Sequence, residues 1–226
     1  MSDPTKTEGL LAGVFAEIAD MAEPVEIHAE RNAELRAAAE DDRQSLQGIE
    51  RRRTALISSE IPLSPGIRQA IAAGHFDESR AVSAALALLA HPRRRFLFLS
   101  GNVGVGKTFA AACAIAEAGA GRFTRATGLV RELHPQGFRE HRPELRASAL
   151  WVVDDLGTED STAAKWRESW FDFVDVRQFY GKTIVTTNLS PAELRLRYDE
   201  RVTDRLRQCA TIVLCSGASM RRGAGL

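Results

Sequence analysis

The sequence predicts a three-layer α/β fold, in which helices cover both faces of a parallel five-stranded sheet. Two observations support this prediction. From residue 95 onward, five short runs of apolar and β-branched residues alternate with helical patterns, which is typical of strands buried on both faces of a parallel sheet. The first run leads directly into a glycine-rich loop and an alanine-rich helix, the order of elements in α/β domains that bind phosphate groups.

The composition is that of one main domain with a short appendage. The chain has 226 residues, of which 44% are hydrophobic, enough to bury one sizeable core. The apolar stretch from Leu10 to Met21 is interrupted by Glu17 and Asp20, is too short to span a bilayer, and lacks the basic start of a signal peptide. The three cysteines include no Cys-x-x-Cys pair, so neither a disulfide framework nor a zinc site is indicated. We therefore expect a cytoplasmic protein without a membrane partner.

Residues 1–60 are expected to form a helical arm ahead of a main domain at 61–226. Apolar residues recur at helical spacing between residues 10 and 21, and residues 26–53 are rich in Ala, Glu and Arg, which favours a long helix with much of its surface in water. The arm has 7 basic and 13 acidic residues, which leaves 23 basic and 17 acidic residues for the rest. Two interpretations stay open: a partner-binding arm, or a solvated helix that leans on the core.

The main domain supplies its elements in a regular order. After the prolines and glycine at 62–66, helices are expected at 67–73 and 78–90. Strands are predicted at 95–100, 122–126, 149–155, 182–188 and 210–215. Helices are predicted between them at 107–119, 127–133, 161–179, 191–197 and 200–208. Ser190, Pro191 and Glu193 predict a capping box at the start of the fourth of these helices.

The loop "GNVGVGKT" at 101–108 matches G-x-x-x-x-G-K-[ST] between a strand and a helix. Its glycines let backbone N–H groups and the helix N-terminus face phosphate oxygens, and Lys107 adds a positive charge. Thr108 is expected to ligate Mg²⁺. The motif therefore predicts a site for ATP and Mg²⁺. The residues assigned to the nucleotide are Gly101, Asn102, Val103, Gly104, Val105, Gly106, Lys107, Thr108 and Phe109.

Polar residues end two of the other predicted strands. Asp154 and Asp155 close the run "LWVVDD"; we expect Asp154 to hold the metal through water, and Asp155 to orient or deprotonate the attacking water. Asn188 closes "KTIVTTN", a strand that we expect to lie between the two phosphate-site strands. Asn188 is a candidate to hold the lytic water or to contact the γ-phosphate. The alternative is that it only helps to begin the helix capped by Ser190.

These motifs together resemble the AAA+ ATPases of the DnaC-type helicase loaders and their IstB-type transposition relatives. The resemblance covers residues 95–222 and rests on "FLFLSGNVGVGKTFAA", "LWVVDDLGTE", "KTIVTTNLSPAELRLRYDERVTDRLR" and "SMRR", in that order. It implies a RecA-like P-loop core and an ATPase of DNA replication initiation. The implied partners are a replicative DNA helicase, single-stranded DNA and further copies of the same chain in a nucleotide-dependent homo-oligomer. An IstB-like ATPase that assists DNA transposition is the alternative within the family.

The resemblance also bears on the two ends of the chain. Only residues 216–226 follow the last predicted strand, so no C-terminal lid domain is expected, and Arg221 or Arg222 is the nearby substitute for a nucleotide-sensing lid arginine. The front of the chain has no sequence that matches the family. Two readings outside the family, a small-molecule kinase and an ATP-binding scaffold without hydrolysis, remain as alternatives.

Two sets of arginines are candidates for contacts outside the ATP loop. In "YDERVTDRLRQ", Arg201 and Arg205 lie four residues apart on one helix face. The resemblance places this box at a subunit edge, with Arg205 as an arginine finger for the neighbouring subunit's ATP and Arg201 as a supporting contact. The alternative is a ladder with Glu200 and Asp204 inside the helix. Candidate contacts to DNA phosphates, with Phe138 as a candidate for base stacking, are Arg125, Arg131, Arg139, Arg142 and Arg146; an ordinary solvated segment is the alternative there.

Overall fold

The structure, a computed structural model, describes residues 45–132, 135–159, 164–198 and 200–217. Its centre is a parallel five-stranded sheet with the strand order β2-β3-β4-β1-β5. The strands are β1 (Phe96–Ser100), β2 (Arg122–Arg125), β3 (Leu150–Leu156), β4 (Lys182–Thr187) and β5 (Ala210–Leu214). Each lies within about one residue of its prediction. The predicted place of β4, between β1 and β3, is confirmed.

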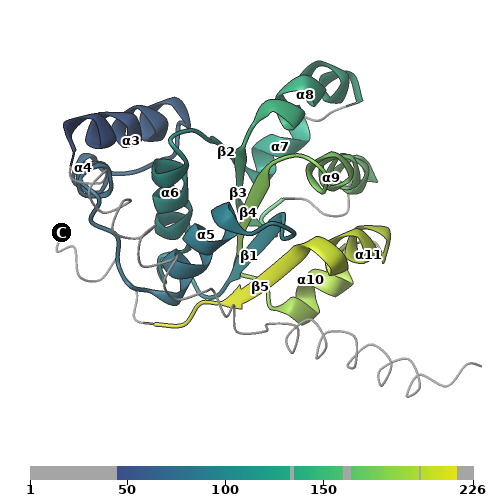
Figure 1. The fold of residues 1–226 in the computed structure, drawn as a ribbon. Helices are drawn as coiled ribbons and strands as arrows, with labels where there is room; N and C mark the ends of the chain where they lie inside the picture. Colours follow the sequence, from purple (N-terminus) through teal and green to yellow (C-terminus); the bar gives the residue numbers. More distant parts are fainter. Residues whose placement is uncertain (1–44, 133–134, 160–163, 199, 218–226) are drawn as a thin grey trace, which may run out of the picture. The chain divides into compact units, whose positions relative to one another are not determined.

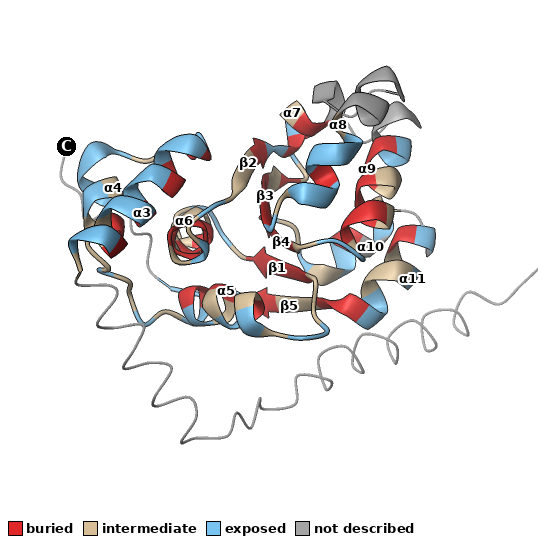
Figure 2. Ribbon diagram, turned by 45° about the horizontal axis from the view of Figure 1, so that its top comes forward, coloured by how far each residue is buried: buried red, intermediate tan, exposed pale blue. Residues whose placement is uncertain are grey.

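Helices cover both faces of the sheet, which confirms the three-layer α/β prediction (Figure 1). One face carries α3 (Leu46–Ser58), α4 (Pro65–Ala72), α5 (Arg80–Ala90) and α6 (Lys107–Ala118). The other face carries α7 (Ala126–Glu132), α8 (Pro135–Ala147), α9 (Ala164–Arg177), α10 (Pro191–Arg197) and α11 (Glu200–Cys209). In Figure 2 the three central strands β1, β3 and β4 are red along most of their length, whereas the two edge strands β2 and β5 are only partly red.

Alternation along β1 divides its side chains between two cores. Leu97 and Leu99 belong to the core under α3 to α6, while Phe96 and Phe98 belong to the core under α7 to α11. Successive side chains of a strand point to opposite faces, so a run that is apolar at every position indicates burial on both sides. The continuous apolar run that predicted β1 therefore reflects the two layers of helices.

The structure has two helices, α7 and α8, where the sequence predicts one between the second and third strands. Pro143 lies inside α8, and an internal proline removes one helical hydrogen bond, so the local sequence disfavours a helix here. Tertiary contacts at the end of α8 offset this loss. Leu145 is fully buried, and Arg177 Nη1 donates to the carbonyl oxygens of Leu145 at 2.8 Å and Ser148 at 2.7 Å.

The end of the predicted arm, α3, packs on the main domain. Ala55 and Leu56 are part of the core, and the buried Arg52 donates from Nε to the carbonyl oxygen of Ala72 over 2.8 Å. Residues 1–44 lie outside the described residues, so the partner-binding arm and the boundary near residue 60 stay predictions. Within the described ranges, no helix is both long enough and apolar enough to cross a membrane.

Candidate ATP-binding and hydrolysis site

The phosphate loop joins β1 to α6 at the carboxyl edge of the sheet. Gly106 has a φ of 88° and caps the N-terminus of α6, a conformation that glycine adopts without steric cost. A Cβ atom at Gly101 would lie 2.2 Å from the carbonyl oxygen of Cys215, because the N–H of Cys215 is bonded to the Ser100 carbonyl oxygen at 2.7 Å. The glycines at these two positions are therefore required by backbone geometry as well as by any phosphate group.

Lys107 is nearly buried, with 6% of its surface exposed, and its ammonium group lies inside this loop. It donates hydrogen bonds to the carbonyl oxygens of Gly101 at 2.6 Å and Asn102 at 2.8 Å. A third bond, of 2.9 Å, reaches Asn188 Oδ1. The contact joins two residues that are 81 positions apart, and it forms because β4 lies beside β1. The structure thus brings Lys107 and Asn188 together, as the strand order predicts.

Thr108 and Asp154 form the second pair of the site. Asp154 Oδ1 accepts hydrogen bonds from Thr108 Oγ1 at 2.9 Å and Thr186 Oγ1 at 2.6 Å. Burial raises the pKa of the Asp154 carboxyl group and the charge of Asp155 adds to this shift, whereas the two hydroxyl bonds oppose it. A hydroxyl and a buried carboxylate side by side are oxygen ligands of the kind that Mg²⁺ prefers. The residues present therefore fit the predicted metal.

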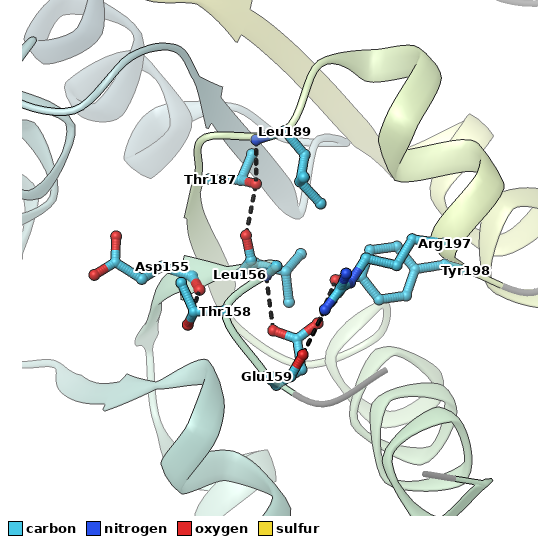
Figure 3. A network of polar contacts seen from close by, with 9 residues as sticks. Asp155, Leu156, Thr158, Glu159, Thr187, Leu189, Arg197 and Tyr198 are labelled. Carbon is cyan, nitrogen blue, oxygen red and sulfur yellow. Dashed lines mark hydrogen bonds and ion pairs between the residues drawn. The ribbon is translucent and has the colours of Figure 1, made fainter. Parts of the chain in front are cut away.

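Asp155 has a different setting from its neighbour. Its φ is +56°, in the left-handed region that is rare for a residue other than glycine, and the β3–β4 pairing shifts register between Val153 and Leu156. Two threonine hydroxyls hold the backbone of this turn: Asp155 N donates to Thr186 Oγ1 at 3.0 Å, and Thr158 Oγ1 donates to the Asp155 carbonyl oxygen at 2.8 Å. Figure 3 shows the Asp155 carboxylate pointing away from the turn that follows it.

Sequence reasoning missed a buried network around Glu159, just after β3 (Figure 3). The Glu159 side chain is 1% exposed and pairs with Arg197 Nε at 3.1 Å. It also accepts hydrogen bonds from Gly157 N at 2.7 Å and from the Tyr198 hydroxyl at 3.0 Å. The network ties the turn after Asp155 to the end of α10. In the sequence, Glu159 looks like any acid in a polar turn, so only the family signature "DDLGTE" marks it.

Arg201 and Arg205 both contact side chains of α9. Arg205 Nε pairs with Asp175 Oδ1 at 2.8 Å, and its guanidinium carbon lies 4.3 Å from the centre of the Phe171 ring. The guanidinium carbon of Arg201 lies 4.9 Å from the same ring centre. The sequence predicted neither Asp175 nor Phe171, because both are far from α11 in the chain. Asp204, a candidate partner in the proposed ladder, instead pairs with Arg207 at 3.5 Å.

The other predicted residues are partly described. Arg125 and Arg142 are exposed, and the charge of Arg125 acts to lower the pKa of Asp154. Arg146 stacks on Tyr180, with 5.2 Å between the guanidinium carbon and the ring centre. The side chains of Arg131, Phe138 and Arg139, and the whole of Arg221 and Arg222, lie outside the described residues. The predicted capping box at Ser190 is confirmed, with reciprocal bonds between Ser190 and Glu193.

Comparisons with known proteins identify a family and a shared fold. The family model of IstB-like ATP-binding proteins matches residues 75–224. No curated protein matches the chain.

Among solved structures, DnaI is 24% identical with a TM-score of 0.50, over 75% of this chain and 92% of that chain. A candidate primosome component from Streptococcus pyogenes serotype M3 is 19% identical with a TM-score of 0.52, over 79% and 100%. AMPPCP-bound DnaA from Aquifex aeolicus is 18% identical with a TM-score of 0.52, over 66% and 51%. These likenesses show a shared fold.

Proposed function

Since the chain belongs to the IstB-like ATP-binding protein family, we propose that it is an ATP-hydrolysing AAA+ protein that loads a replicative helicase during the initiation of DNA replication. The observation that carries the hydrolytic part is the pairing of Lys107 with Asn188 and of Thr108 with Asp154 at adjacent strand ends. A loop that only closed a strand–helix connection would not need a nearly buried ammonium group bonded to two loop carbonyls and a side-chain amide. This cluster favours a working ATPase over an inert scaffold.

The proposed chemistry follows from these positions. Phosphate oxygens of ATP would replace the carbonyl acceptors of Lys107, so the ammonium group would hold the β- and γ-phosphates. Thr108 and Asp154 would hold Mg²⁺, which neutralises phosphate charge when it is bound. Asp155, whose carboxylate leaves the sheet at the register shift, would accept a proton from the attacking water. Asn188 would hold that water in line with the γ-phosphorus.

Arg205 is proposed to complete the site of a neighbouring copy. Its guanidinium lies on the α9–α11 surface, where it contacts Asp175, Phe171 and the carbonyl oxygen of Arg201. The Arg205 and Asp175 side chains are 32% and 44% exposed, and an ion pair this exposed is worth about 1 kcal/mol or less. Arg205 could therefore leave Asp175 and bind a phosphate of the neighbour's ATP with little loss of free energy. Nucleotide-dependent assembly into a homo-oligomer is part of the proposal.

The proposed partners are a replicative helicase and single-stranded DNA. The shared fold with DnaI and with a candidate primosome component supports replication as the process. A protein with this function works in the cytoplasm. The second candidate is an IstB-like ATPase that assists DNA transposition, because the matching family model is that of IstB-like ATP-binding proteins. This second function predicts that the protein binds duplex DNA and recruits a transposase.

Size analysis with ATP, ADP and single-stranded DNA, followed by pull-down of a helicase, tests the proposal. We expect ATP and DNA together to enlarge the assembly and to retain the helicase, and Lys107→Ala to abolish both effects. An assembly that grows on duplex DNA and retains a transposase would favour the second candidate. An assembly state that neither nucleotide nor DNA changes would contradict both.

A further inference from the structure

Three segments that carry basic and aromatic residues lie at the amino-terminal edge of the sheet, the edge opposite the Lys107 loop. They are the loop before β1, the end of α8 and the turn between α9 and β4. We call this set the basic edge. Its members are Arg93, Arg94, Arg95, Arg146, Phe179 and Tyr180.

Backbone contacts place these segments next to each other. The N–H of Arg95 donates to the Cys209 carbonyl oxygen at 2.7 Å, and the Arg95 carbonyl oxygen accepts from Thr183 N at 2.7 Å. The Lys182 ammonium group donates to the Arg94 carbonyl oxygen at 2.7 Å. The loop of three arginines therefore borders the start of β4, two residues after Tyr180.

A buried arginine fixes the other half of the basic edge. Arg177 is fully buried, and besides its bonds to α8 it donates to Thr183 Oγ1 at 3.1 Å and to the Lys182 carbonyl oxygen. The end of α8, which carries Arg146, is thereby fastened to the turn that carries Tyr180. The two side chains face each other across this junction, with the guanidinium of Arg146 over the ring of Tyr180.

The charge of the basic edge is not balanced locally. Among the residues that the structure describes, no ion pair joins Arg93, Arg94, Arg95 or Arg146 to a carboxylate. The neighbouring Glu144 is engaged by Arg122. Burial and then the charge of Arg95 lower the pKa of Arg177 to about 10. Positive groups that repel one another in this way favour a polyanion as the ligand.

The aromatic members are open to solvent. Phe179 is 67% exposed and Tyr180 is 39% exposed, unusual for large rings that only stabilise a core. An open hollow of about 500 Å³ lies beside Tyr180, lined by Arg142, Pro143, Arg146, Ala147 and Tyr180. An accessible ring next to arginines is the combination that binds unpaired bases, since every base has a face that can stack.

We propose that the basic edge binds single-stranded nucleic acid, with phosphates on the exposed Arg93 and Arg146 and a base stacked on Tyr180 or Phe179. Exposed rings favour single strands over duplexes, in which the faces of the bases are already stacked on each other. The site lies at the opposite edge of the sheet from the ATP loop. The inference rests on the proposed function, which already includes single-stranded DNA, and it assigns that ligand a surface where binding needs neither ATP nor assembly.

Fluorescence anisotropy with a labelled oligothymidylate of about 20 nucleotides, measured without nucleotide over a range of salt concentrations, tests the proposal. Removing one phosphate contact should lower the salt slope by about 0.7 and weaken binding roughly three- to fivefold at physiological salt. We expect this of Arg93→Ala and Arg146→Ala. Arg53→Ala, an exposed arginine on α3, is the matched control and should bind as the unmodified chain does.

Tyr180→Ala separates stacking from charge. Loss of one stacked base should weaken binding roughly fivefold or more at every salt concentration while leaving the slope unchanged. Binding of a duplex of the same length should not change in this variant. Equal losses on single and double strands would overturn the assignment to single strands.

Two further outcomes would overturn the proposal. The first is that Arg93→Ala and Arg146→Ala bind as Arg53→Ala does. The second is that a polyglutamate peptide competes as well as the oligonucleotide, which would assign the basic edge to an acidic protein. Lys107→Ala should leave nucleotide-free binding intact, so failure of ATP-dependent loading and failure of this site give different results.

Discussion

Asp154 and Asp155 are neighbours in the sequence, but the backbone gives them different surroundings. Asp154 is buried and accepts hydrogen bonds from the hydroxyl groups of Thr108 and Thr186. Asp155 itself has a left-handed backbone conformation, which takes its carboxylate out of the sheet. The first position suits a residue that holds a cation, and the second suits a residue that meets the attacking water.

Asp155→Asn keeps the shape of this side chain and removes its charge and basicity. We expect the kcat of ATP hydrolysis to fall by about 10²- to 10⁴-fold, the usual contribution of a general base. The Kd for ATP should change little, because Asp155 does not contact the Lys107 loop in the proposed mechanism. Steady-state kinetics and binding of a fluorescent ATP analogue check this, with the exposed Asp204→Asn as control. Normal kcat in Asp155→Asn would assign the base to another residue.

Residues differ in how far the sequence could predict their roles. Lys107 and Thr108 belong to one local motif, so their placement at a helix start was predictable. Asn188 was predictable through the order of the strands. Asp175 and Glu159 were not, because their partners lie 30 and 38 positions away on helices whose packing no local pattern specifies.

At the scale of elements, the Glu159 network links the turn after β3 to the end of α10. Because α11 begins shortly after α10, this link also sets where Arg201 and Arg205 lie relative to Asp154 and Asp155. We infer that Glu159 positions α10 and takes no part in the chemistry. Beside it, Thr187 Oγ1 joins the ends of β4 and β3 by donating to the Leu156 carbonyl oxygen at 2.7 Å.

Glu159→Gln should destabilise the fold because it leaves Arg197 facing a neutral group in a largely buried site. We expect the free energy of unfolding to fall by about 2–4 kcal/mol, somewhat below the usual loss for breaking a fully buried pair. Urea denaturation measures this, with Glu168→Gln on the exposed side of α9 as the matched control. Equal stability in the two variants would show that the ion pair contributes nothing measurable.

The elements themselves were largely predictable, and their exceptions have physical reasons. All five strands and most helices follow from apolar runs and capping residues such as Ser190. The second helix at 135–147 was not predicted, because Pro143 opposes it locally and the contacts of Leu145 and Arg177 that favour it are tertiary. Sequence patterns report the local preference for helix or strand, and in α8 the tertiary contacts outweigh the local preference against a helix.

At the scale of the whole molecule, the described domain has functional candidates on three separate surfaces. The ATP loop lies at the carboxyl-terminal edge of the sheet, and Arg205 lies on the α9–α11 surface. The residues of the basic edge lie at the amino-terminal edge of the sheet. Because Arg205 lies on a surface away from the ATP loop of its own chain, it suits a protein in which each ATP site is completed by a neighbouring copy. The central claim is therefore that hydrolysis requires Arg205 from a second copy.

Arg205→Ala alone should keep its affinity for ATP and lose the increase in hydrolysis that comes with assembly. An arginine finger contributes about 10³- to 10⁵-fold to kcat in other nucleotide hydrolases, so the loss should be large. Hydrolysis per chain, measured as a function of protein concentration with and without single-stranded DNA, checks this. Arg207→Ala, which removes an exposed arginine of the same helix, should behave as the unmodified chain does.

Mixing two inactive variants tests the claim most directly. Lys107→Ala has no working ATP site but carries Arg205, and Arg205→Ala has an ATP site but no finger. We predict that neither hydrolyses ATP at an appreciable rate alone, and that a mixture does, because one copy supplies Arg205 to the other. A mixture that assembles and remains inactive, or an Arg205→Ala chain that is fully active alone, would contradict the account.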